Sequence, residues 1–268
     1  MKKRLLSLLL LPAFAASAQD MPAPGVAART SGPTTYKNIR LGLYIAPTSS
    51  WMRPTANQDD AGNYNVSNNG SIVGFMYGLM AEFYFAENYA ITTGLQVNHT
   101  GGQILATSVS DNTSDNQVRT ADFTYHLQYL EIPLNVKLRT YGLGTTGLRV
   151  FGQVGLTAGF NIGKKVDYTV NYYDHDAGTL ETATGDHVKL TGTLTTAPVM
   201  LQMNLGAGIE YPVGNGMALY AGLFFNNGFL PDATNPDKYD AGRLGYKGSF
   251  KDGNTRLNNL ALRVGIYF

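Results

Sequence analysis

The feature that most constrains this chain is a two-residue period: large apolar side chains occupy every second position in eight separate segments. In the clearest segment, Leu130, Ile132, Leu134, Val136 and Leu138 alternate with polar or charged residues. Because successive side chains of a β-strand point to opposite faces, each segment predicts a strand with one apolar and one polar face. The eight segments are 39–45, 73–85, 89–97, 130–138, 148–162, 199–211, 217–225 and 260–268.

The composition decides between a soluble sandwich and a membrane barrel. Charged residues make up only 15% of the chain, against roughly 25% in soluble proteins, and there are 31 Gly and 17 Tyr. The polar face of each segment is rich in Gly and Tyr, whereas a water-facing surface would carry Lys and Glu. The pattern therefore predicts an all-β fold, a transmembrane antiparallel up-and-down β-barrel with its apolar face toward lipid.

The connections between the segments support the same fold. Short connections (86–88, 140–147 and 212–216) alternate strictly with long ones (48–71, 107–120, 164–198 and 230–256). Outer-membrane barrels have short periplasmic turns and long extracellular loops, so both chain ends are expected on the periplasmic side. Eight strands are predicted, with ten as the alternative, because 166–172 and 188–194 also resemble strands. With no turn before Val166, this pair is expected to form a protruding hairpin.

The N-terminal segment has the features of an export signal. Lys2, Lys3 and Arg4 precede an apolar run at 5–11, and Ala16-Ser17-Ala18 fits a cleavage site. We expect residues 1–18 to be a cleaved signal peptide, 19–37 a flexible periplasmic leader and 38–268 the barrel domain, located in the outer membrane of a Gram-negative cell. Removal of 1–18 would leave 17 basic against 19 acidic residues, a net charge of −2, which does not favour nucleic acid as a partner.

One strand carries a family resemblance. Residues 129–137, Tyr-Leu-Glu-Ile-Pro-Leu-Asn-Val-Lys, resemble the corresponding strand of the PorT-like outer-membrane β-barrel family. The resemblance implies an outer-membrane barrel and, through the founding members, a link to protein secretion, with other envelope or secretion-system proteins as partners. Phe268 is similar to the C-terminal aromatic that barrel-assembly machinery reads. Membrane lipids and that machinery are therefore the other expected partners.

The polar faces predict the contents of the lumen. An eight-stranded barrel is just wide enough for side chains to fill, and unpaired charges there would be costly. We therefore expect a paired network that plugs the lumen, as in OmpA-type small barrels; a narrow gated pore for ions or small solutes is the alternative. Strand parity, the alternation of side chains between the two faces of a strand, assigns three acids and five bases to this network. They are Arg40, Glu82, Glu131, Lys137, Arg139, Arg149, Glu210 and Arg263.

The sequence predicts no catalytic, cofactor-binding or metal site. Asp174-His175-Asp176 and Asp186-His187 lie in the third long connection, but their spacing identifies no nucleophile, base and orienting group. Asp174-x-Asp176-x-Gly178 is similar to the start of a calcium loop but lacks the closing Glu. These residues are expected to be solvated, and His99 and His126 to lie near the outer strand ends. The chain is predicted to be a structural or accessory outer-membrane component and not an enzyme.

Overall fold

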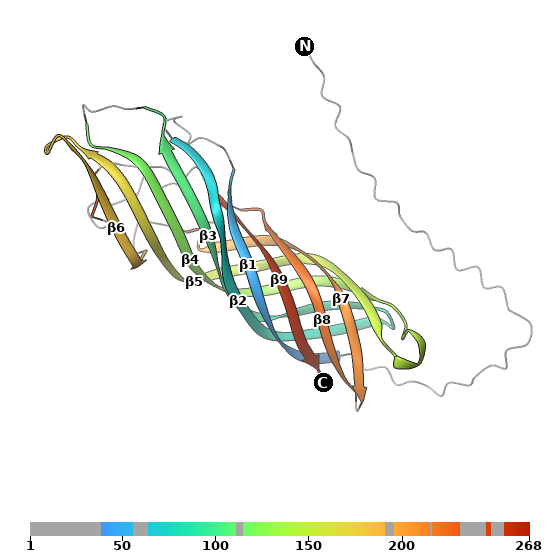
Figure 1. The fold of residues 1–268 in the computed structure, drawn as a ribbon. Coiled ribbons are helices and arrows are strands. Elements are labelled where there is room, and N and C mark those ends of the chain that lie inside the picture. The colour runs from blue at the N-terminus through green and yellow to red at the C-terminus, as the bar shows by residue number, and fades with distance from the viewer. Residues whose placement is uncertain are drawn as a thin grey trace, which may run out of the picture. The chain divides into compact units, whose positions relative to one another are not determined.

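A computed structural model describes residues 39–55, 64–110, 115–190, 196–214, 216–230, 245–247 and 255–268. Within these residues the chain forms one sheet of nine antiparallel strands, eight of which close into a ring (Figure 1). The proposed signal peptide, 1–18, and leader, 19–37, lie outside the described residues. None of the described residues forms a helix long and apolar enough to cross a membrane.

Each neighbouring pair in the ring is antiparallel, and the sheet closes through β4 pairing with β5 on one side and β1 with β9 on the other. The ring order is β1-β2-β3-β4-β5-β7-β8-β9, while β6 pairs with β5 outside the ring. The strands are β1 (Ile39–Pro54), β2 (Tyr64–Ala86), β3 (Tyr89–Ser108), β4 (Gln117–Arg139), β5 (Arg149–Asp174), β6 (Thr179–Lys189), β7 (Val199–Gly214), β8 (Met217–Gly228) and β9 (Thr255–Tyr267).

The predicted eight-stranded barrel is confirmed, and the ten-strand alternative is wrong. Two residues join β2 to β3, and a short segment containing the 3₁₀ turn η1 (Gly144–Thr146) joins β4 to β5. We call this the short-turn end. At the opposite, long-loop end the strands continue well beyond the predicted bounds: β4 begins at Gln117 instead of Leu130, and β5 continues to Asp174. Backbone pairing persists there although the side-chain pattern that marks the eight segments does not.

The side-chain pattern inverts along the barrel. Near the short-turn end, a region we call the lower barrel, β4 turns Leu134 outward at 60% exposure and buries Asn135. Toward the long-loop end, a region we call the collar, the same strand buries Phe123 and Tyr125 inside and turns Thr124 outward. On β4 the collar comprises residues 117–129 and the lower barrel residues 131–139.

A β-bulge adapts β5 to this inversion. Gln128 of β4 pairs with Gly163 and Tyr129 pairs with Asn161, so Ile162 is an extra residue without a partner on β4. A single inserted residue exchanges the two faces of the strand that follows it. Beyond the bulge Val166 is therefore buried in the collar, although extrapolation of the parity of 148–162 would turn it outward.

Inward glycines make room for aromatic rings in the lower barrel. A Cβ on Gly206 would lie 2.3 Å from Cδ1 of Phe224, and one on Gly265 would lie 2.4 Å from Cε1 of Tyr220. Both rings are buried, Phe224 at 2% and Tyr220 at 4% exposure. The narrow lumen therefore accommodates large side chains because the neighbouring strands supply none at these positions.

Candidate functional site

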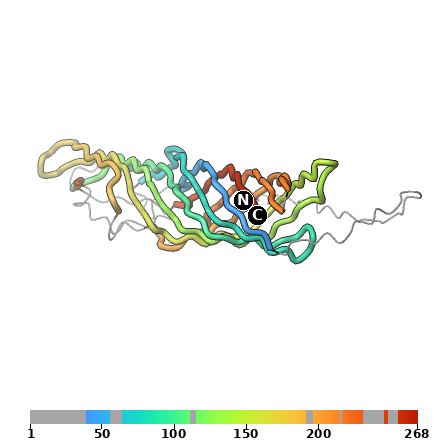
Figure 2. The backbone as a smooth tube through the Cα atoms, turned by 90° about the horizontal axis from the view of Figure 1, so that it is seen from below, coloured from blue at the N-terminus to red at the C-terminus, as the bar shows by residue number. Residues whose placement is uncertain are grey.

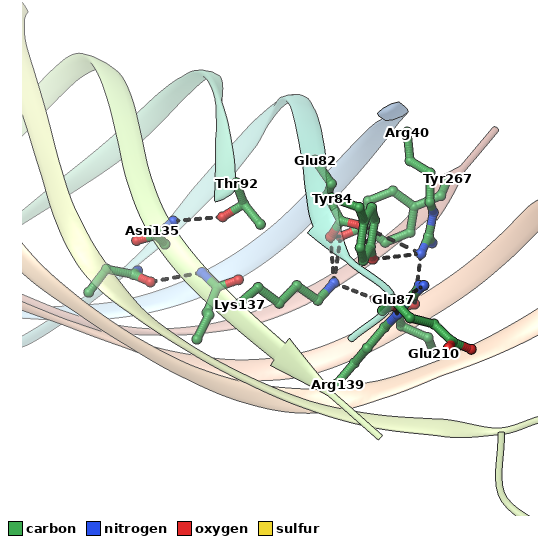
Figure 3. A network of polar contacts seen from close by, with 12 residues as sticks. Arg40, Glu82, Tyr84, Glu87, Thr92, Asn135, Lys137, Arg139, Glu210 and Tyr267 are labelled. Atoms are coloured by element: carbon green, nitrogen blue, oxygen red, sulfur yellow. Dashed lines mark hydrogen bonds and ion pairs between the residues drawn. The ribbon is translucent and has the colours of Figure 1, made fainter. Parts of the chain in front are cut away.

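The most concentrated polar site lies inside the lower barrel and is centred on Lys137 of β4 (Figure 3). The Lys137 ammonium donates to Glu82 of β2 at 2.5 Å, to the hydroxyl of Tyr267 of β9 at 3.1 Å, and to Glu210 of β7. Arg40 of β1 contributes a second cation, 3.0 Å from Glu210 and 3.5 Å from Glu82. We call these five residues, together with Tyr84 and Arg139, the lumen charge cluster.

Hydrogen bonds and aromatic rings complete this cluster. The Tyr84 hydroxyl donates to Glu82 at 2.7 Å, and the Arg139 guanidinium lies 3.8 Å from Glu210. The Arg139 guanidinium also lies 4.1 Å from the ring centroid of Tyr84, and that of Arg40 lies 4.0 Å from the ring of Tyr267. Three cations thus share two carboxylates. The pairing, hydrogen bonds and π-faces together offset part of the cost of removing these charges from water.

Glu131 occupies a separate site among amides. Its carboxylate accepts a hydrogen bond from Asn98 at 2.8 Å and another from Gln96, and the carbonyl of Gln96 accepts from the Tyr44 hydroxyl. Among the described residues Glu131 has no ion-pair partner within 4.0 Å. This carboxylate is therefore held by hydrogen bonds from neutral donors, where strand parity alone had predicted a close ion pair.

The structure thus divides the eight predicted lumen residues. Arg40, Glu82, Lys137, Arg139 and Glu210 come together in the cluster. The Arg263 guanidinium lies 4.3 Å from the ring centroid of Phe224 and 5.0 Å from that of Tyr44. Within the described part of the chain neither Arg263 nor Arg149 forms an ion pair, so a single network of eight charges does not form.

A chain of amides follows the inner wall of four neighbouring strands beyond the cluster. Gln153 of β5 donates to Asn204 of β7 at 2.9 Å, Asn204 donates to Asn226 of β8 at 2.5 Å, and Asn226 donates to Asn259 of β9 at 2.6 Å. The three Asn side chains are at most 1% exposed. Parity places all four residues on the inner face, but only the register between strands aligns them at one height.

Among the described residues, little open space remains inside the lower barrel. A cavity of about 20 Å³ lies among Tyr44, Met80, Gln96, Phe151 and their neighbours in the lower barrel. Such a cavity has room for roughly one water molecule. In the collar the interior is closed by a cluster of apolar side chains that includes Met52, Ile104, Phe123, Tyr125, Val166 and Leu257.

The outer face of the collar holds an arrangement that the sequence analysis missed. His126 Nε2 of β4 lies 2.8 Å from Asp167 Oδ2 of β5, and His187 Nδ1 of β6 lies 3.2 Å from Asp167 Oδ1. The hydrogen bond with Asp186, 2.7 Å away, and the charge of Asp167 raise the pKa of His187 above its ordinary value. Three strands contribute, so no spacing within the sequence could have revealed the group; the inferred hairpin was the single signal available.

The residues that resembled a calcium loop form a different contact. The ammonium of Lys247 lies 2.8 Å from Asp174 and 3.0 Å from Asp176. The hydrogen bond from Lys247 is the main cause that lowers the pKa of the Asp174 carboxyl. These two carboxylates are therefore paired with a cation of the chain itself.

Phe268 lies at the short-turn end, 49% exposed, and its backbone N–H donates to the carbonyl of Leu41 at 2.9 Å.

Comparison with known proteins gives one family match and several structural similarities. The family model described as "Outer membrane protein beta-barrel domain" matches residues 18–235. Neisserial surface protein A (NspA) is 12% identical, with 86% of this chain and 97% of that chain covered and a TM-score of 0.37. The outer membrane protein AlkL is 12% identical (91% and 95% covered, TM-score 0.36), and Ail of Yersinia pestis is 11% identical (86% and 97% covered, TM-score 0.34). No match was found among curated proteins.

Proposed function

Because this chain belongs to the outer membrane protein beta-barrel domain family, we propose that it serves the outer membrane as a closed barrel with a filled lumen. Its role would be that of a structural or accessory component, without catalytic activity. The observation that carries this proposal is the lumen charge cluster, in which Lys137 bridges Glu82 and Glu210 across the barrel. Side chains from opposite walls therefore meet in the space that a conducting path would need (Figure 3).

Three successive layers support a closed lumen. The charge cluster lies nearest the short-turn end, the amide chain from Gln153 to Asn259 follows, and the apolar collar interior lies beyond. An ion crossing these layers would have to displace buried ion pairs and then enter an apolar region, both of which are unfavourable. Wide diffusion channels instead need about 16 strands.

Conductance measurements test the closed-lumen proposal. Purified protein inserted into planar bilayers should give no stable single-channel steps, and neither should Lys189→Met, a control variant on the exposed face of β6. Lys137→Met, which removes the central cation, is the variant most able to open the lumen. Stable, uniform steps from the unaltered protein would contradict the proposal.

A narrow gated pore is the second candidate, and one observation favours it. Arg40, Lys137 and Arg139 share two carboxylates, so one cation is in excess. Each carboxylate therefore has more than one cation with which it can pair. This candidate expects voltage-dependent steps from the unaltered protein that change in Lys137→Met. If the unaltered protein shows no conductance steps across the voltage range, the pore is excluded and the structural role of a closed barrel is left.

We also propose that the lower barrel faces lipid, that the long-loop end faces outward and that residues 1–18 are removed on export. The chain has no cysteine, so single cysteines can report the topology. Leu180→Cys on the exposed hairpin should react with a membrane-impermeant maleimide on intact cells, whereas Glu87→Cys in the short turn should react only after lysis. The opposite pattern would reverse the topology.

The resemblance of 129–137 to PorT-like proteins supports a further proposal, that this barrel assists protein secretion. A strain lacking the chain should then lose particular surface proteins and regain them when the intact gene is returned. An unchanged surface proteome would exclude the secretion role and leave the structural one.

The terminal aromatic Phe268 supports assembly by the barrel-assembly machinery, and its replacement by Ala should reduce the amount of folded barrel in the membrane.

A further inference from the structure

We propose that His126, Asp167 and His187 form a binding site for a zinc-class divalent cation on the outer face of the collar. Two imidazole nitrogens and one carboxylate lie with their ligand atoms within 4.8 Å of one another. Imidazole and carboxylate are ligands that Zn²⁺ accepts, and three protein ligands with an open fourth position is an established arrangement for zinc.

The distances suit a single ion. Asp167 lies 2.8 Å from the His126 nitrogen and 3.2 Å from the His187 nitrogen. Ligand atoms at the corners of a tetrahedron around zinc, each about 2.0–2.1 Å from the metal, lie about 3.3 Å apart. The two imidazole rings are stacked, with centroids 5.0 Å apart and planes inclined by 14°. A modest rotation of the rings would point both nitrogens at one ion beside the carboxylate.

The backbone brings His187 to this position through a β-bulge. Val166 pairs with Val188 and Tyr168 pairs with Gly185, so two residues of β6, Asp186 and His187, lie opposite Asp167 alone. His187 has a φ of 50°, in the left-handed region that residues other than glycine seldom adopt. Bulges of this kind redirect side chains. Here the bulge turns the His187 imidazole and its backbone N–H toward the same carboxylate, with the N–H donating at 2.5 Å.

The surroundings leave room for a ligand and for the fourth metal position. The His126 and Asp167 side chains are 37% and 31% exposed, and Asp186 lies 2.7 Å from His187. A hollow of about 300 Å³ adjoins both histidines and is also lined by His99, Gln128 and Lys165. Asp167 and Asp186 bring two carboxylates to the site, and the hollow is also lined by two lysines, Lys164 and Lys165. A water molecule or Asp186 would complete the coordination.

Bound metal would tie the hairpin to the barrel wall. Within the described residues β6 pairs with β5 alone, so its other edge has no strand partner. The site joins β6 through His187 to β5 through Asp167 and to β4 through His126. A cation there would add a cross-link between three strands and restrain the hairpin relative to the ring.

Zinc titration of the full-length folded protein in detergent tests the site. Calorimetry with ZnCl₂ should find one ion per chain. His126→Gln and His187→Gln should each weaken binding at least tenfold, and His175→Gln, a control on the same hairpin, should not. MgCl₂ should not bind comparably, since Mg²⁺ prefers oxygen ligands. Circular dichroism establishes that each variant keeps its β-sheet content.

Hydrogen exchange separates this site from adventitious zinc. Zinc should slow amide exchange across 179–189 in the unaltered protein but not in the double variant His126→Gln/His187→Gln. No zinc binding by the unaltered protein would overturn the proposal. Binding that the double variant retains with the same affinity would also overturn it, as would binding that leaves exchange in β6 unchanged.

Discussion

The lower barrel and the collar use the same strands but bury opposite kinds of side chain. On β4, Leu134 in the lower barrel is 60% exposed while Asn135 beside it is 3% exposed, whereas Phe123 in the collar is fully buried. An apolar exterior suits hydrocarbon and an apolar interior suits water. The comparison teaches that the ladder of backbone hydrogen bonds accepts either arrangement. The surrounding solvent therefore determines which face of a strand must be apolar at each height.

The largest effects are expected inside the barrel, beginning with loss of the central cation from the polar interior of the lower barrel. Lys137→Met leaves Glu82 and Glu210 buried without the ammonium they share, and should lower the free energy of unfolding by about 3–5 kcal/mol. Urea unfolding in lipid vesicles, followed by the fluorescence of the single tryptophan, Trp51, measures this. The exposed control Lys189→Met should change stability by less than about 0.5 kcal/mol. Equal effects would show that the cluster carries no special cost.

The collar should respond to loss of an apolar side chain instead. Phe123→Ala empties a fully buried position and should cost about 3–5 kcal/mol by the same unfolding measurement. Leu134→Ala, on the outer face of the lower barrel, opens no protein cavity and should cost less. A larger loss at Leu134 than at Phe123 would mean that the collar interior is loosely packed.

Charge on the outer face should distinguish the two regions. Leu134→Arg should destabilise the barrel by about 2–4 kcal/mol if the side chain lies near the bilayer midplane. Thr124 lies on the same face of β4 as Leu134, but in the collar. Thr124→Arg should therefore change the free energy of unfolding by less than about 0.5 kcal/mol. If both substitutions were tolerated equally, the lower barrel would not be surrounded by lipid.

The smallest effect is expected at Glu131. Glu131→Gln keeps the size of the side chain but presents an NH₂ group where the carboxylate accepts from Gln96 and Asn98. Loss of hydrogen bonds to a charged group predicts a cost of about 1–3 kcal/mol. A cost as large as that of Lys137→Met would instead indicate that Glu131 is held by a cation such as Arg263.

Much of the lower barrel could be predicted from the sequence, because a single solvent imposes one alternation on each strand. Leu134 outward and Lys137 inward follow from parity alone. The collar could not be predicted in the same way, since its apolar positions lie on the other face and Ile162 shifts the parity of β5. In the sequence these effects look like the end of a strand.

The contents of the lumen were predictable as a set but not as pairs. Parity assigns Lys137 and Glu131 to the same interior, yet the stagger between strands places Lys137 beside Glu210 and leaves Glu131 among amides. Strand register determines height, and a single alternating sequence carries little information about register. The group of His126, Asp167 and His187 depends on the same information and on a bulge in β6.

The position of β9 in the ring has a consequence for the order of assembly. Gly42 near the start of β1 pairs with Tyr267 at the end of β9, so the last seam joins segments that are far apart along the chain (Figure 2). Such long-range closure is slow, because the entropy of the intervening chain opposes it. Tyr267 also donates to Glu82 in the charge cluster. The cluster therefore reaches its full set of partners only when β9 has joined the ring, and a barrel without Tyr267 would lack the hydroxyl that contacts both Glu82 and Lys137.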